Sequence, residues 1–80
     1  MAMDDSQSPS VRKITVGSVP IELSALLKFA GLTESGGEAK QLIRQGLVLV
    51  NGEVETRKGK KLGAGDRVTV GGETLVIEVG

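Results

Sequence analysis

From residue 20 onward in this 80-residue chain, the spacing of apolar residues changes once, near Gly46, and the change restricts the fold that the chain can adopt. Between residues 20 and 45 the apolar residues recur every three to four positions, as in helices that bury one face. From residue 47 onward they alternate or form short apolar blocks, as in strands. The pattern predicts an α+β domain in which two N-terminal helices pack on a small, mostly antiparallel β-sheet.

The first helix is expected near residues 20–30. Pro20 and Glu22 suit its first turn, because proline is tolerated there and a carboxylate is favoured at the positive end of the helix dipole. Gly31 follows as a left-handed cap. The buried face is expected to consist of Leu23, Leu26, Leu27 and Ala30.

The second helix is expected near residues 35–45. Ser35 and Glu38 have the spacing of a capping box, in which each side chain bonds a free backbone N–H at the start of the helix. Gly46 is expected to end the helix. Its apolar face comprises Ala39, Leu42 and Ile43. Lys40 and Arg44, four residues apart, project together from another side.

Strands are expected at residues 11–16, 47–50, 53–56, 67–70 and 74–79. The first suits an edge position and needs a partner, for which a C-terminal strand is expected. Asn51-Gly52 is a strong signal for a tight hairpin turn, and Gly71-Gly72 predicts a second one. The glycine- and lysine-rich residues 57–66 are expected to form a loop between the two hairpins.

Residues 1–10 are polar, contain Pro9 and three serines, and lack periodicity. They are predicted to form a disordered tail, which leaves residues 11–80 as one domain. The apolar runs are far too short to cross a membrane, and the polar start does not resemble a signal peptide. A cytoplasmic protein is therefore expected.

The absence of cysteine and histidine removes the side chains on which most enzymes and zinc sites depend. A nucleophile would have to be Ser, Thr or Lys beside a carboxylate, and no motif marks one. Gly59, Gly63 and Gly65 do not form a P-loop, since no Gly-Lys-Ser or Gly-Lys-Thr opens a helix after them. Neither an enzyme nor a metal, cofactor or small-molecule substrate is expected.

Charge is distributed unevenly, although the net charge of the chain is zero. Residues 11–80 carry ten basic and eight acidic side chains, and four of the five residues at 57–61, called the basic loop below, are basic. Such a loop can simply be solvated, and Lys40 and Arg44 can be solubilising groups bonded to Glu34 or Glu38. The combination of both basic segments favours binding to a nucleic acid.

Two further features bear on how an RNA would be bound. Gly36-Gly37 at a helix start can present N–H groups to a phosphate, or can permit close packing against the first helix. Phe29 is the only aromatic residue and is expected to be partly buried, so stacking on splayed bases is not expected. Contacts with phosphates and 2′-hydroxyls of folded RNA are expected instead.

Residues 35–56, SGGEAKQLIRQGLVLVNGEVET, together with Gly65-Asp66, resemble the RNA-binding domain named after the fourth small-subunit ribosomal protein, which contains the αL motif. The resemblance covers residues 21–70. It includes the helix IELSALLKFAG, the helix end LIRQG and the hairpin VLVNG. Short stand-alone bacterial members look most similar, through ESGGEAK and VETRKGKKL. Many members have arginine where this chain has Gly36.

The resemblance implies binding to structured RNA, ribosomal or transfer, with the ribosome as a further partner and no membrane. The RNA-binding residues are expected to be Ser35, Gly36, Gly37, Lys40, Gln41, Arg44, Arg57, Lys58, Lys60 and Lys61. An alternative, favoured by net neutrality and by Gly36, is a protein-interaction adaptor of the translation or ribosome-assembly machinery that keeps the fold without binding RNA.

Overall fold

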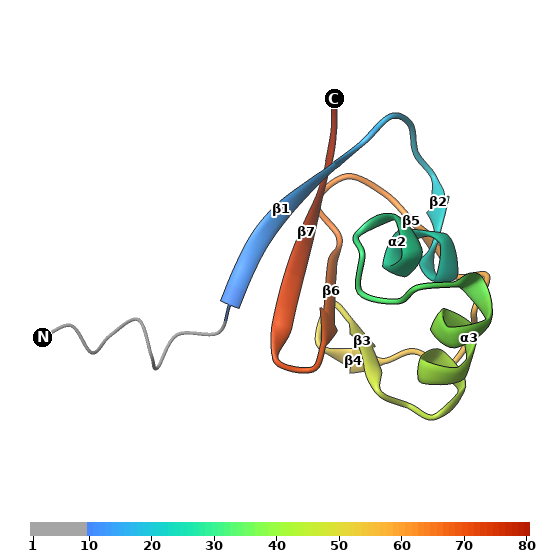
Figure 1. The fold of residues 1–80 in the computed structure, drawn as a ribbon. Helices are drawn as coiled ribbons and strands as arrows, with labels where there is room; N and C mark the ends of the chain where they lie inside the picture. Colours follow the sequence, from blue (N-terminus) through green and yellow to red (C-terminus); the bar gives the residue numbers. More distant parts are fainter. Residues whose placement is uncertain (1–9) are drawn as a thin grey trace, which may run out of the picture.

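The computed structural model describes residues 10–80, so the tail predicted at residues 1–10 lies outside the described part except for Ser10, which begins the first strand. The elements are β1 (Ser10–Val16), β2 (Ile21–Glu22), α2 (Leu23–Phe29), α3 (Gly36–Arg44), β3 (Val48–Val50), β4 (Glu53–Val54), β5 (Lys61–Leu62), β6 (Arg67–Val70) and β7 (Glu73–Val79). Figure 1 shows β1 at one side of the molecule and the helices at the other. The α+β prediction is confirmed.

Five strands form the main sheet in the order β1-β7-β6-β3-β4. β1 runs parallel to β7, with Val16 opposite Val79, and the other neighbours are antiparallel. This confirms the expected edge position of the N-terminal strand and its pairing with a C-terminal one. β4 ends at Val54, two residues earlier than predicted.

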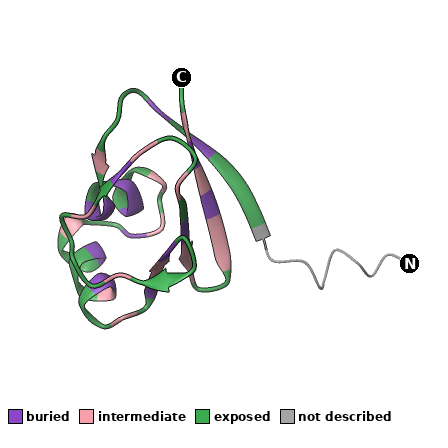
Figure 2. Ribbon diagram, turned by 180° about the vertical axis from the view of Figure 1, so that it is seen from behind, coloured by how far each residue is buried: buried purple, intermediate pink, exposed green. Residues whose placement is uncertain are grey.

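The core lies between the two helices and the sheet, where Figure 2 shows buried segments on both. Its members include Leu23, Leu26 and Leu27 of α2, Ala39 and Ile43 of α3, and Val48, Val68, Leu75 and Ile77 of the sheet. Each large side chain buried in this way stabilises the fold by about 1.5–3 kcal/mol. Leu42 is only partly buried, at the edge of this core.

The first helix begins at Leu23 and not at Pro20, which corrects the predicted start. Ile21 and Glu22 are extended because they pair with Leu62 and Lys61 in a separate two-stranded sheet, β2-β5. The carboxylate of Glu22 makes no capping hydrogen bond to the helix. A pairing between segments about 40 residues apart therefore overrides the local helix signal.

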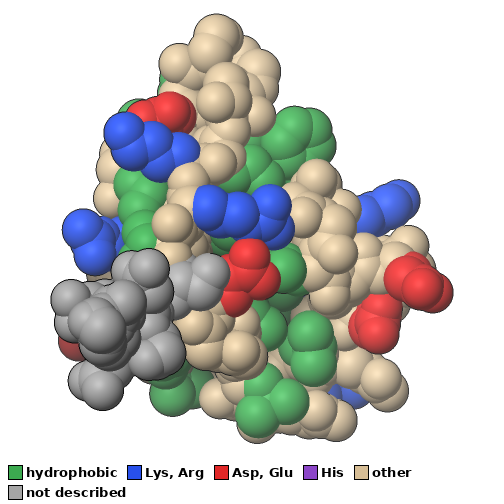
Figure 3. Space-filling model, turned by 60° about the vertical axis from the view of Figure 1, so that its left-hand side comes forward, with side chains coloured by type: hydrophobic (Ala, Val, Ile, Leu, Met, Phe, Trp, Pro, Cys, Tyr) green, Lys and Arg blue, Asp and Glu red, His purple; other side chains and the backbone are tan. Residues whose placement is uncertain are grey.

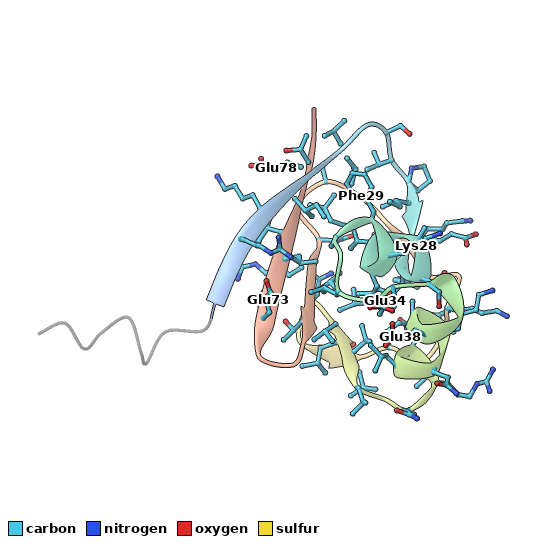
Figure 4. The ribbon with its side chains drawn as sticks, viewed as in Figure 1. Lys28, Phe29, Glu34, Glu38, Glu73 and Glu78 are labelled. Carbon is cyan, nitrogen blue, oxygen red and sulfur yellow. The ribbon has the colours of Figure 1, made fainter. Side chains whose placement is uncertain are left out.

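Phe29 is 60% exposed, which corrects the expectation that it is partly buried. It follows Leu27 by two residues, and at about 100° per residue its side chain is rotated roughly 200° away from that of Leu27. The helix ends at Phe29, and Figure 4 labels this residue. The only aromatic ring of the chain thus contributes little to the core.

The second helix begins at Gly36, as predicted. Glu38 N–H donates to Ser35 Oγ (3.2 Å), and Glu38 Oε1 accepts from the backbone N–H of Glu34 (2.8 Å). In a capping box the carboxylate accepts from the N-cap residue itself, so the bond here is shifted by one residue. Gly31 and Gly46 both have φ of +78° and end the two helices in the left-handed conformation, as expected.

Candidate nucleic-acid interface

Lys40, Gln41 and Arg44 all have exposed side chains on α3. Among residues 10–80, neither Lys40 nor Arg44 has a carboxylate partner within 4.0 Å. The predicted alternative, in which Glu34 or Glu38 neutralises them, is therefore not realised. Both cations remain available to a ligand.

The backbone of the basic loop is fixed against the start of α2. The N–H groups of Leu23 and Ser24 donate to the carbonyl oxygens of Lys60 (2.9 Å) and Lys58 (3.2 Å). These bonds satisfy two of the N–H groups that the first turn of a helix leaves without a partner. Since α2 also packs against α3, the basic loop and α3 are both held by the same helix.

Two of the four cations in the basic loop are already paired. Arg57 Nε lies 2.9 Å from Glu55 Oε2, and Lys61 Nζ lies 3.1 Å from Glu22 Oε2. Lys58 and Lys60 have no such partner within the described residues. The charge of the loop is therefore less available than its sequence suggests.

The Arg57 hydrogen bonds hold the pKa of Glu55 below its ordinary value, and in turn raise the pKa of Arg57. The Glu55 side chain is only 13% exposed, whereas that of Arg57 is 73% exposed. The carboxylate thus stays ionised under an arginine that faces solvent.

Gly36 has open space where a Cβ atom would lie, and at Gly37 only Ser35 Oγ is near, at 3.9 Å. Close packing against the first helix, the alternative reading of these glycines, is therefore wrong. The Ser35 hydroxyl is occupied by its cap. Figure 4 shows Glu34 and Glu38 near one another beside α3, and these carboxylates weaken the attraction of this helix start for an anion.

Asn51 joins the first hairpin to the turn before β6. Its φ of +53°, followed by +87° at Gly52, gives the tight turn that the sequence predicts. Its side-chain Oδ1 accepts from Arg67 N–H (3.0 Å), and its Nδ2 donates to Asp66 Oδ1 (3.2 Å). Asp66 Oδ2 in turn accepts from Gly63 N–H (2.8 Å). The Asn-Gly and Gly-Asp pairs of the sequence thus form one structural unit.

Three charged residues near the predicted site were missed by sequence reasoning. Glu55 could have been recognised, since it lies two residues before Arg57 and therefore on the same side of an extended segment. Glu22 could not, because its partner Lys61 is distant in sequence. Lys28, exposed on the last turn of α2, suits the negative end of the helix dipole.

The face that carries β1 differs from the side with α3. Figure 3 shows Lys and Arg side chains there among carboxylates and exposed apolar groups, with no concentration of one charge. Ion pairs join β1 to β7, namely Arg12 to Glu73 (2.8 Å) and Lys13 to Glu78 (3.4 Å). In Figure 1 the basic loop and α3 lie on the side remote from this strand.

No helix within residues 10–80 has both the length and the apolar character needed to span a membrane.

Comparison with known proteins identifies the family. The S4 domain pattern matches residues 14–78. YbcJ of Escherichia coli is 46% identical over 57 residues, which are 71% of this chain and 81% of YbcJ. Its solution structure, described as revealing an αL motif involved in RNA binding, superimposes with a TM-score of 0.63 at 42% identity and covers 81% of this chain and 84% of YbcJ.

Two other relatives are informative. "Probable ribosome maturation protein RlbA" of Bacillus subtilis is 41% identical over 59 residues, 74% of this chain and 83% of RlbA. Tyrosine–tRNA ligase of Bordetella pertussis is 38% identical over 85% of this chain, but the match spans only 15% of the ligase. The similarity to enzymes is thus confined to a small part of them, and the prediction that this chain is not an enzyme is confirmed. The chain belongs to the S4 domain family, and its fold is the α+β arrangement with an αL motif.

Proposed function

We propose that this chain binds folded RNA through one basic surface, formed by α3 and the basic loop, and that its natural target is ribosomal RNA. The observation that carries the proposal is that four exposed or half-exposed cations on α3 and the basic loop have no carboxylate partner within the described residues. These free cations are Lys40, Arg44, Lys58 and Lys60.

The fixed loop favours recognition of RNA by shape. Hydrogen bonds to α2 hold the backbone of the basic loop in one conformation. The lysines of the loop therefore lose less conformational entropy on binding than those of a mobile loop would. Each phosphate that a lysine or arginine neutralises releases a counterion, which makes the affinity dependent on salt. The Gln41 amide, between the two cations of α3, suits a 2′-hydroxyl because it both donates and accepts hydrogen bonds.

Ribosomal RNA is proposed ahead of transfer RNA on the strength of the relatives. RlbA, which this chain covers over 83% of its length, is named for ribosome maturation, whereas the tRNA ligases are matched over a small part only. The helix start at Ser35, Gly36 and Gly37 is proposed as a secondary contact, since two carboxylates lie beside it. A protein with this target works in the cytoplasm.

The proposal is tested by mobility shift with helical fragments of ribosomal RNA, with transfer RNA, and with duplex DNA of equal length, each at two salt concentrations. Ribosomal RNA is expected to bind most tightly, with an affinity that falls as salt rises. Tighter binding of transfer RNA would overturn the choice of target. Absence of binding to any RNA would favour the adaptor alternative, in which the same surface docks on a protein.

A further inference from the structure

A hollow of about 330 Å³ lies between the β3–β4 hairpin and the basic loop. Its volume is near the lower end of the range for sites that hold small ligands, about 300–1,000 Å³. A hollow of this volume fits a single nucleoside but is too small for a double-helical segment of RNA. Its lining residues are Val50, Asn51, Glu53, Val54, Glu55, Arg57 and Lys60.

One wall of the hollow is a fixed arginine. Glu55 Oε2 accepts from the Arg57 backbone N–H (3.0 Å) and from Nε (2.9 Å), and Oε1 accepts from Nη2 (3.4 Å). Two contacts from the guanidinium and one from the backbone N–H, all to one largely buried carboxylate, hold the guanidinium in one orientation, while 73% of the Arg57 side chain is exposed. A guanidinium plane held in this way is a surface on which a nucleic-acid base stacks.

The hairpin supplies groups of different chemistry. Val54 is 59% exposed and offers an apolar contact for a base. The Asn51 amide is unavailable, because both of its ends are bonded to Asp66 and Arg67. Glu53 is exposed, and within residues 10–80 its carboxylate has no ion-pair or hydrogen-bond partner. The hollow therefore combines a stacking cation, an apolar contact and a free carboxylate.

We infer that the hollow holds one unpaired guanine nucleotide of the bound RNA. The base lies against Arg57 and Val54, the Glu53 carboxylate accepts from guanine N1–H and N2–H, and Lys60 pairs with the phosphate. A carboxylate presents two acceptor oxygens side by side, and guanine is the base that offers two adjacent N–H donors on its Watson–Crick edge. The inference rests on the proposed function and adds to it a contact that reads a base.

The test uses three RNA hairpins that differ at one position: one is fully paired, one has a bulged guanosine and one has a bulged uridine. Binding is measured by fluorescence anisotropy. The bulged guanosine is expected to raise the affinity about tenfold over both other hairpins, which is within the range for a good bidentate contact to a base. Equal affinity for all three hairpins would overturn the inference while leaving RNA binding intact.

The variant Glu53→Gln assigns the effect to the carboxylate. The amide keeps the size of the side chain but replaces one acceptor with a donor, so the tenfold preference is expected to disappear. Glu78→Gln is the matched control: it removes the same charge from β7, where Glu78 pairs with Lys13, and is expected to keep the preference. Retention of the preference in Glu53→Gln, with both variants folded by thermal melt, would overturn the assignment.

Guanosine monophosphate alone distinguishes a free nucleotide from one within RNA. In amide NMR spectra it is expected to shift the Val54 signal only weakly at millimolar concentration. Tight binding of the free nucleotide that the RNA does not compete away would mark a small-molecule site and overturn the inference. Failure of all three hairpins to bind would instead remove the proposed function itself.

Discussion

Glu55 and Arg57 form a local unit in which one carboxylate binds both the backbone N–H and the guanidinium of the residue two positions later. The unit lies where β4 ends and the basic loop begins. It fixes the direction in which the chain leaves the hairpin.

The Glu55–Arg57 unit is expected to make stability depend on pH. The folded-state pKa of Glu55 is depressed, so its contribution is fully present above the unfolded-state pKa and is lost as pH falls through the folded-state pKa. Thermal melts of wild type and Glu55→Gln are expected to differ most at neutral pH and to converge in acid, below the ordinary glutamate pKa of about 4.3. A constant difference down to pH 3 would contradict this assignment.

Two alanine substitutions in α3 are expected to show which of its apolar side chains belongs to the core and which lies at its edge. Ile43 is fully buried, and Ile43→Ala is expected to cost about 2–5 kcal/mol of the free energy of unfolding. Leu42, although on the predicted apolar face, is only partly buried, so Leu42→Ala is expected to cost clearly less. Urea denaturation measures both. An equal or larger loss for Leu42→Ala would mean that α3 is rotated relative to the sheet.

The two pairs of free cations are expected to act on the same RNA. In a plot of log K against log salt concentration the slope is negative, and each phosphate contact adds about 0.9 to its magnitude. Replacing Lys58 and Lys60 with alanine, or Lys40 and Arg44 with alanine, should therefore reduce this magnitude by about 0.9 per lost contact. Salt titrations of both double variants check this, with Lys13→Ala on β1 as the control. A folded double variant that binds like wild type would show that its pair lies outside the site.

Glu22 is expected to restrain RNA binding by occupying Lys61. Glu22→Gln should free this cation, strengthen binding severalfold and steepen the salt slope by up to about 0.9. Glu78→Gln frees Lys13 on the remote strand in the same way and should leave the slope unchanged. Equal effects of the two variants would indicate a general response to net charge.

Gly36→Arg is expected to strengthen RNA binding, because it restores the arginine of many family members at a position with open space around it. Its φ is not in the left-handed region, so a side chain is tolerated there. Mobility shift is expected to show a gain of several fold at unchanged thermal stability. A loss of affinity would show that RNA approaches this helix start too closely for a side chain.

The helix start and the tight turn that the sequence predicted correctly depend on neighbours in the chain. The start of α3 follows from Ser35 and Glu38, and the first hairpin from Asn51-Gly52, because these signals act within three residues. The start of α2 was predicted wrongly, since the pairing of Ile21 with Leu62 decides it. The neutralisation of Lys61 by Glu22 was missed for the same reason. Its partner becomes adjacent only in the folded chain.

The hydrogen bonds from Leu23 and Ser24 to the basic loop give the protein a reporter of loop opening. These two amide hydrogens can exchange with solvent only when the loop leaves the helix, so their exchange rates measure the free energy of that local opening. A ligand that binds the closed loop lowers the open population by mass action and slows both rates together. Hydrogen exchange at two backbone positions can thus detect an RNA that touches neither of them.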